Sequence, residues 1–226
     1  MARPRRAVLF ELENLAVDGH GLVYDAVKSV FKGKGIDLPP ALFSRCCLGR
    51  APQSYVPAIL KHAGKERLSH EKLEEDLRVT IQEAFAADSL RLNPSLAALL
   101  QAVAAQGVGC GALSGLENSL AEKLFARLGL KALGVALHVG AADRRGFPTA
   151  EAWGKLSQGL AVDPVYCLAL CTTAQSTRAA LAAHMHAIAI PHALSAFEDY
   201  SGADEVLDSL QALRPEQLLA RLEPGW

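Results

Sequence analysis

Residues 8–19 read VLFELENLAVDG, and this stretch decides how the rest of the chain is interpreted. Three apolar residues are followed by two carboxylates two positions apart, Glu11 and Glu13, and the stretch ends in Asp-Gly. Residues two apart in a strand point to the same face, so we expect both carboxylates on one face at the carboxyl end of a strand. Open α/β sheets place their ligand sites at that end.

The composition is that of an Ala- and Leu-rich α/β protein with one large domain or two unequal ones. Half of the 226 residues are apolar, and 23 Lys plus Arg nearly balance 24 Asp plus Glu. A net charge of −1 gives no electrostatic reason to expect nucleic acid or an anionic membrane as a partner. The first apolar run is broken at Glu11, which makes it too short for a signal peptide, and no apolar stretch is long enough to span a membrane.

The five cysteines form no metal-binding or disulfide spacing. We therefore expect free, mostly buried thiols and a cytoplasmic location, because a reducing compartment keeps thiols free. The cysteines are Cys46, Cys47, Cys110, Cys167 and Cys171.

Short apolar runs alternate with helical patterns, which predicts an α/β fold with a doubly wound, Rossmann-like parallel sheet covered by helices. The predicted strands occupy residues 7–12, 108–113, 134–139, 166–171 and 187–190. Asn93 followed by Pro94 predicts one helix start, and Thr149 predicts another. The tail predicts two short amphipathic helices over residues 203–213 and 215–222.

Residues 19–90 show helical spacing and no convincing strand. One predicted helix carries Val23, Val27, Val30 and Phe31, and a longer one carries Leu73, Leu77, Ile81 and Phe85. We therefore predict an all-α cap inserted over residues 19–90 into an α/β core formed by residues 1–18 and 91–226. The hinges are expected near residues 18–21 and 89–94.

Five stretches in this order resemble the motifs of the haloacid dehalogenase superfamily, in the branch with a small helical cap that includes phosphoglycolate phosphatases and β-phosphoglucomutases. FELENLAVDG at 10–19 is similar to the strand, Asp-x-Asp and cap linker, and CGALS at 110–114 to the strand that ends in Ser or Thr. RGFPTAEAWGKLSQGLAV at 145–162 is similar to the third motif, and CLALCTTAQSTRAALAAHM at 167–185 to the fourth. ADEVLDSL at 203–210 is similar to the usual ending of the family. The resemblance covers almost the whole chain.

The resemblance implies phosphoryl chemistry with defined roles. The first carboxylate attacks phosphorus, and the second protonates the leaving group and later activates water. The hydroxyl of the second motif and the lysine of the third hold the phosphate. Mg²⁺ is held by the first carboxylate, the backbone carbonyl at the second carboxylate and an acid in the fourth motif.

The chain departs from this pattern at most of the functional positions. Glu11 and Glu13 replace the two catalytic aspartates, and the added methylene moves each carboxylate forward by about 1 Å, a misplacement that can cost on the order of 10²-fold. Phe147 stands at the lysine position, and Thr172 and Thr173 stand at the acidic and Ser positions of the fourth motif. Only the second motif is retained, with Ser114 followed by Gly115.

We therefore expect a protein that has lost phosphatase activity, with Glu11 and Glu13 as degenerate catalytic positions. Ser114, Gly115, Phe147, Thr172 and Thr173 are the expected phosphate- or ligand-binding positions. No metal and no cofactor are expected, and Glu11 and Glu13 are the only candidates to hold a metal. The cleft would then bind an unknown small molecule or a protein.

Two other hypotheses remain open. The chain is an active phosphatase or phosphotransferase that uses Mg²⁺ and Glu11, with Arg144, Arg145 or a cap lysine as the missing cation. Alternatively, it is a structural subunit with an empty cleft whose apolar surfaces form a homodimer.

Each candidate residue also has a purely structural interpretation. Glu11 and Glu13 are then vestiges, and Ser114 caps the helix that follows it. Phe147 fills the space of the lost lysine by packing. Thr172 and Thr173 are turn and N-cap residues before an Ala-rich helix, which is the interpretation favoured for that pair.

Overall fold

A parallel sheet forms the centre of the molecule. The computed structural model describes residues 5–141 and 146–222, and within these ranges the sheet has six strands in the order β3-β2-β1-β4-β5-β6, all parallel. The strands are β1 Ala7–Glu11, β2 Gly109–Ser114, β3 Val135–Val139, β4 Cys167–Cys171, β5 His186–Ala189 and β6 Glu205–Val206. The predicted α/β class and the five predicted strands are confirmed.

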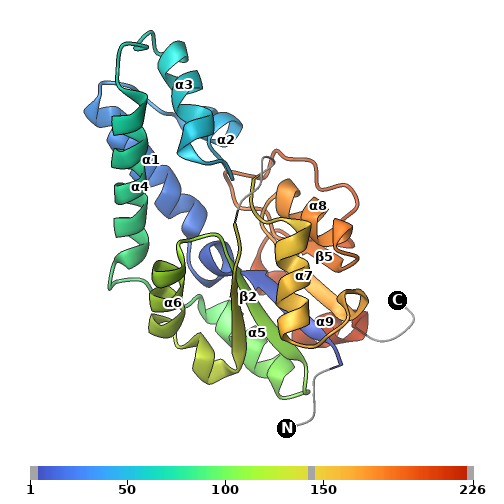
Figure 1. Cartoon of the computed structure of the whole chain (residues 1–226). Helices are drawn as coiled ribbons and strands as arrows, with labels where there is room; N and C mark the ends of the chain where they lie inside the picture. Colours follow the sequence, from blue (N-terminus) through green and yellow to red (C-terminus); the bar gives the residue numbers. More distant parts are fainter. Residues whose placement is uncertain (1–4, 142–145, 223–226) are drawn as a thin grey trace.

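The side chains of β1 alternate between two hydrophobic clusters on opposite faces of the sheet. Val8 and Phe10 pack in the cluster on one face, and Ala7 and Leu9 pack in the cluster on the other face. All four side chains are fully buried, as expected for a central parallel strand covered on both faces. The first cluster lies beneath α5 Pro94–Ala104, α6 Asn118–Arg127 and α9 Pro215–Arg221 (Figure 1). The second cluster lies beneath α7 Ala150–Gly159 and α8 Ala174–Ala182.

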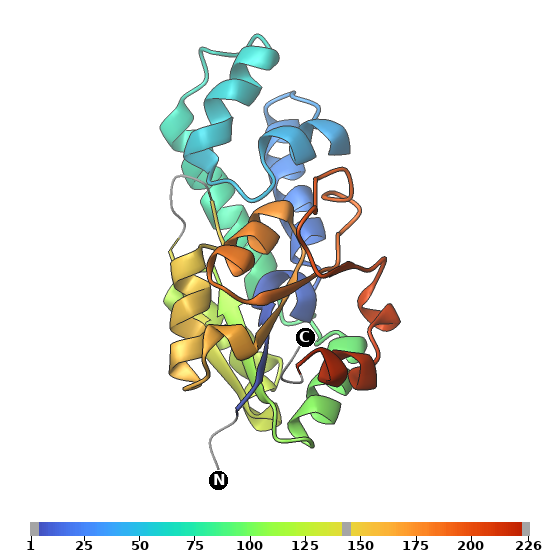
Figure 2. The same ribbon diagram turned by 90° about the vertical axis from the view of Figure 1, so that its right-hand side faces the viewer.

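Four helices between β1 and α5 form a cap with its own hydrophobic cluster. They are α1 Gly19–Gly33, α2 Pro40–Cys46, α3 Pro52–His62 and α4 His70–Ala86. Figure 2 shows these helices beyond the upper end of the sheet, whereas α9 (red) packs beside α5 (green) near its lower end. Leu73 and Leu77 lie in the cap cluster, whereas Phe85, on the same helix, packs against the core. The predicted helical cap is present, and its exact boundaries stay a prediction.

Side-chain caps fix the helix starts that the sequence predicted. Asn93 accepts a hydrogen bond from the Ser95 N–H, and Thr149 accepts one from the Ala152 N–H. Each side chain satisfies one backbone N–H that has no partner within its helix.

The prediction of a helix over residues 203–213 is wrong. Residues 205–206 form β6, and residues 210–212 form a single 3₁₀ turn. The open edge of β5 explains the difference. Asp204 N–H donates to Ala187 C=O, and Asp204 Oδ2 accepts from Ala187 N–H. Leu207 N–H donates to Ala189 C=O. Pairing with an existing sheet edge therefore prevails over the local helical pattern. The helix predicted over 215–222 is confirmed as α9.

The thiols and the helix lengths bear on two further expectations. All five cysteines are free thiols, and four of them are buried. No helix within the described ranges is long and apolar enough to cross a membrane.

The start of α1 approaches the preceding turn so closely that only glycine fits there. A Cβ on Gly19 would lie 2.4 Å from the Glu13 carbonyl oxygen and 2.7 Å from Asn14 Oδ1. A Cβ on Gly33, at the other end of the same helix, would meet no atom within 4 Å. Gly19 therefore sets how closely the cap begins to the end of β1.

We expect Gly19→Ala to lower the free energy of unfolding by about 1–3 kcal/mol, the usual range for overpacking. Gly33→Ala is the matched control, and it should leave the stability unchanged or raise it by less than about 1 kcal/mol. Urea denaturation of the three proteins measures both effects. Equal stabilities of the two variants would contradict the role assigned to Gly19.

Candidate functional site

The chain leaves the sheet at Glu11 and makes one π-helical turn, Leu12–Ala16, before the cap begins. Glu11 is the last residue of β1, whereas Glu13 lies inside the turn. The expectation that both carboxylates extend from one face of a strand is therefore wrong. The turn directs the two side chains to the ends of different neighbouring strands, Glu11 to β4 and Glu13 to β2.

Glu11 is held by hydrogen-bond donors from the end of β4 and from Asn14 in the turn that follows β1. Its Oε1 accepts from the Thr172 N–H (2.9 Å), and its Oε2 accepts from the Thr172 hydroxyl (2.7 Å) and from Asn14 Nδ2 (2.7 Å). The side chain is only 2% exposed. Three donors thus stabilise a carboxylate that has no cation as a direct partner among the described residues.

Glu13 binds a set of three donors at the end of β2, which we call the Ser114 cradle: the Ser114 hydroxyl and the backbone N–H groups of Gly115 and Leu116. All three donate to Glu13 Oε1, at 2.6, 2.7 and 3.0 Å. Burial raises the pKa of Glu13, and the three hydrogen bonds oppose that shift. The helix after β2 has Glu117 as its N-cap residue, so the expectation that Ser114 caps it is wrong.

Phe147 lies beside the residues that directly follow the carboxyl ends of β2 and β3. A Cβ added to Gly115 would lie 2.7 Å from the Phe147 ring, and one added to Gly140 would lie 3.0 Å from it. The ring also packs against the buried cluster beneath α7 and α8. The packing interpretation of Phe147 therefore agrees with its surroundings. Arg144 and Arg145, named as alternative cations, lie outside the described residues.

Thr172 and Thr173 follow β4 and have separate roles. Thr173 is the N-cap residue of α8, where its hydroxyl accepts a hydrogen bond from the Ser176 N–H. Thr172 binds Glu11, and its own carbonyl accepts hydrogen bonds from Ser195 Oγ (2.7 Å) and Tyr200 Oη (3.1 Å). Both threonines are buried. The N-cap interpretation fits Thr173, whereas Thr172 is part of the site floor.

His20 is the residue of this site that sequence reasoning missed. It lies in the first turn of α1, and its Nε2 is 2.9 Å from Thr172 Oγ1, 152 positions away in the chain. His192 packs against the His20 ring, and its Nε2 is 3.3 Å from Asp18 Oδ1. No spacing rule connects residues so far apart, so only the folded topology could reveal the contact.

Burial lowers the pKa of His20 to about 4, although the Glu11 carboxylate acts in the opposite direction. His20 is therefore neutral at pH 7. The Thr172 hydroxyl donates its single hydrogen to Glu11. In the contact between His20 and Thr172, His20 Nε2 is therefore the donor and the hydroxyl oxygen is the acceptor.

The residues present do not fit a Mg²⁺ site. Mg²⁺ requires oxygen ligands in octahedral geometry, whereas Thr172 directs its N–H and O–H hydrogens toward Glu11. Glu13, the other acidic candidate, is turned toward the Ser114 cradle. The described residues contain no group of three or more His, Cys, Asp or Glu that could hold a metal ion.

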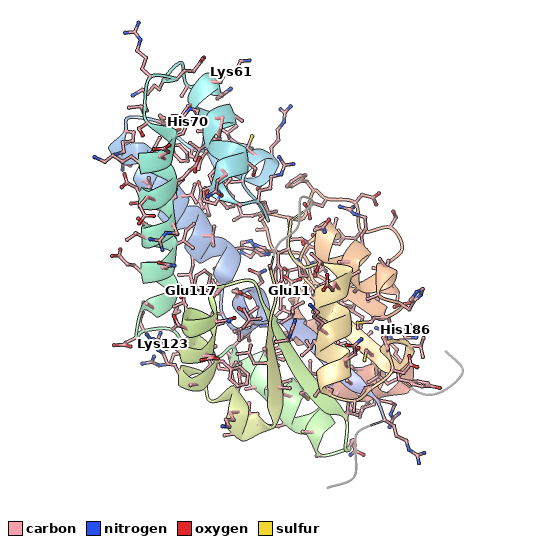
Figure 3. The ribbon with its side chains drawn as sticks, viewed as in Figure 1. Glu11, Lys61, His70, Glu117, Lys123 and His186 are labelled. Atoms are coloured by element: carbon pink, nitrogen blue, oxygen red, sulfur yellow. The ribbon has the colours of Figure 1, made fainter. Side chains whose placement is uncertain are left out.

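A cavity of about 290 Å³ lies between this floor and the cap. Its floor includes Glu11, Glu13, Asn14 and His20, and Phe147 and Arg50 also line it. Figure 3 shows Glu11 where the sheet meets the cap, and Lys61 and His70 at the far end of the cap. Among the described lining residues there is no lysine, so a cap lysine does not supply the missing cation in this structure.

Comparison with solved structures shows what this architecture resembles. CbbY from Rhodobacter sphaeroides, in complex with xylulose-(1,5)bisphosphate, matches with a TM-score of 0.75 and 19% identity over 96% of this chain and 99% of that one. β-Phosphoglucomutase from Clostridium difficile gives a TM-score of 0.75 and 19% identity over 96% of each chain. Structures named as an HAD family hydrolase from Deinococcus radiodurans and a haloacid dehalogenase-like protein from Agrobacterium tumefaciens match with TM-scores of 0.74 and 0.73. The chain has the haloacid dehalogenase fold. The helical cap formed by α1 to α4 is consistent with these similar structures.

Another similar structure with this haloacid dehalogenase fold is a predicted phosphoglycolate phosphatase from Haemophilus somnus. It has a TM-score of 0.74 and 16% identity over 99% of this chain and all of that one. No protein-family model and no curated protein matches the sequence. At these identities the similarity establishes the fold, and the activity has to be inferred from the residues of the site.

The low pKa of His20 makes stability depend on pH. The unfolded chain takes up this proton near pH 6.5, whereas the folded protein takes it up only near pH 4, so acid favours unfolding within this window. The contribution is fully present above about pH 6.5 and is lost as the pH falls toward 4. From pH 7.5 to pH 5 we expect His20 alone to lower the free energy of unfolding by about 2 kcal/mol.

Urea denaturation of the wild type and of His20→Gln at both pH values isolates this effect. The variant should lose about 2 kcal/mol less than the wild type on acidification. His62→Gln removes an exposed histidine and serves as the control. An unchanged pH dependence in His20→Gln would show that His20 is not held neutral.

Proposed function

We propose that this protein with the haloacid dehalogenase fold does not hydrolyse phosphate monoesters and uses the cavity between core and cap to bind a small molecule. The observation that carries the proposal is the Glu13 carboxylate in the Ser114 cradle. A hydroxyl and consecutive backbone N–H groups are the donors that proteins use to hold an anion. In this chain the anion is supplied by its own side chain.

A phosphate group cannot share the Ser114 cradle with Glu13. All three donors converge on one glutamate oxygen within 3.0 Å, so a phosphate oxygen would have to displace it. If Glu13 stayed nearby and ionised, it would repel the incoming anion, and no described lysine lines the cavity to offset that repulsion. Phosphate binding is therefore opposed both by occupancy and by charge.

Glu11 is also poorly suited to attack phosphorus. Three hydrogen bonds stabilise its charge, and a nucleophile held in this way loses part of that stabilisation when it forms a bond. The described residues offer no group of three or more His, Cys, Asp or Glu that could hold a metal ion, and Arg50 is the one described lysine or arginine that lines the cavity. These features together support loss of the activity rather than a change of nucleophile.

The remaining expectations stay proposals beside this one. We propose that the protein uses no cofactor and that its partner is a small molecule, with a protein partner and a homodimer as alternatives. A cytoplasmic location agrees with five free cysteines. The active-enzyme hypothesis now depends on Arg50 or on residues outside the described ranges for its cation.

We expect no Mg²⁺-dependent phosphate release from a panel of phosphate monoesters, with the wild type no faster than Glu11→Ala. The combined variant Glu11→Asp, Glu13→Asp, Phe147→Lys and Thr172→Asp returns the acidic groups and the cation, and it should gain measurable turnover and Mg²⁺ binding. Circular dichroism melting confirms that each protein is folded. Robust Mg²⁺-dependent turnover by the wild type that Glu11→Ala abolishes would refute the proposal.

A further inference from the structure

The polar atoms of the cavity floor that lack a partner are hydrogen-bond acceptors. Glu13 uses Oε1 for all three bonds in the Ser114 cradle, so Oε2 has no hydrogen-bond partner among the described residues. Asn14 Nδ2 donates one of its two hydrogens to Glu11, and Asn14 Oδ1 has no hydrogen-bond partner among the described residues. Both residues line the cavity.

His20 adds a third acceptor to the same floor. Because its Nε2 carries the hydrogen of the contact with Thr172, the other ring nitrogen, Nδ1, presents a lone pair. No hydrogen bond joins Nδ1 to a described residue, and the side chain is only 7% exposed. The described buried side-chain atoms that lack a partner do not include Nδ1, so this nitrogen is accessible to water or to a ligand in the cavity that His20 lines.

The walls above this floor are mostly apolar. Phe43 and Ile81 come from the cap, and Leu116 and Phe147 come from the core. Arg50 is the one cation among the described lining residues, and its side chain is exposed. The cavity therefore combines an apolar body with an acidic, acceptor-rich floor.

We propose that the cavity binds a small cationic amine, whose ammonium group donates to the acceptors of the floor while its apolar body packs between the cap and Phe147. An ammonium group has three donors and no acceptor, and its positive charge favours the ionised form of Glu13 against the effect of burial, which raises the pKa of this carboxyl. A neutral alcohol offers one donor and no charge, and a phosphate ester offers only anionic acceptors. The inference depends on the proposed function, because a floor that held Mg²⁺ and phosphate would not have these free acceptors.

The test compares three probes of similar apolar body by isothermal titration at neutral pH: 2-phenylethylamine, 2-phenylethanol and phenyl phosphate. We expect the amine to bind, the alcohol to bind at least about tenfold more weakly, and phenyl phosphate not to bind, since a charge-assisted hydrogen bond is worth about tenfold or more. Equal affinity for amine and alcohol, preference for phenyl phosphate, or no binding of the amine at millimolar concentration would overturn the proposal.

Glu13→Gln tests the floor directly. The glutamine can keep its carbonyl oxygen in the Ser114 cradle, but it replaces the free acceptor by an NH₂ donor, so amine affinity should fall at least about tenfold. Glu117→Gln removes the same charge from an exposed residue that does not line the cavity and should leave affinity unchanged. Figure 3 places Glu117 at the start of α6.

The expected titration outcomes differ from those of the phosphatase assay. Retained amine affinity in Glu13→Gln would overturn the amine proposal, and so would its equal loss in both variants. If the amine fails to bind while phosphate release stays absent, only this inference fails. If phosphate release is found, the proposed function itself fails.

Discussion

Two glutamates lie at the start of the cap linker, and no described lysine lies beside them, so each carboxylate must be satisfied by hydrogen-bond donors of the protein. The single π-helical turn at Leu12–Ala16 makes this arrangement possible. It sends Glu11 to the N–H and hydroxyl of Thr172 and Glu13 to the Ser114 cradle. The ends of β2 and β4 are thereby joined to the turn that follows β1 by hydrogen bonds of side chains.

This arrangement also links the cap to the core. His20 in the first turn of α1 contacts Thr172, and Asp18, the N-cap residue of the same helix, contacts His192. Both contacts lie beside the close approach at Gly19. These contacts at the beginning of α1, together with the packing of Phe85 against the core, hold the cap above the cavity.

The sequence predicted those features that depend on local physical chemistry. The buried strands could be recognised because residues such as Val8 and Leu9 form continuous apolar runs. The helix starts could be recognised because Asn93 and Thr149 are residue types that cap helix N-termini. The ends of β1, β2 and β4 place Glu11, Ser114 and Thr172 at one edge of the sheet, as parallel pairing requires.

Features that depend on three-dimensional geometry could not be predicted in the same way. The period-2 interpretation failed at Glu13 because the chain had already left the sheet. The contact between His20 and Thr172 joins residues 152 positions apart, and β6 forms because β5 offers an open edge. In each case the conformation depends on a residue or strand that is distant in the sequence, rather than on the local sequence.

A crystal structure grown with millimolar Mg²⁺ and inorganic phosphate tests the central claim most directly. The account predicts that Glu13 Oε1 remains within hydrogen-bonding distance of Ser114 Oγ and of the Gly115 and Leu116 nitrogens, and that Glu11 remains bound to Thr172. An octahedral ion ligated by Glu11, together with a phosphate on Ser114 and a displaced Glu13, would contradict it.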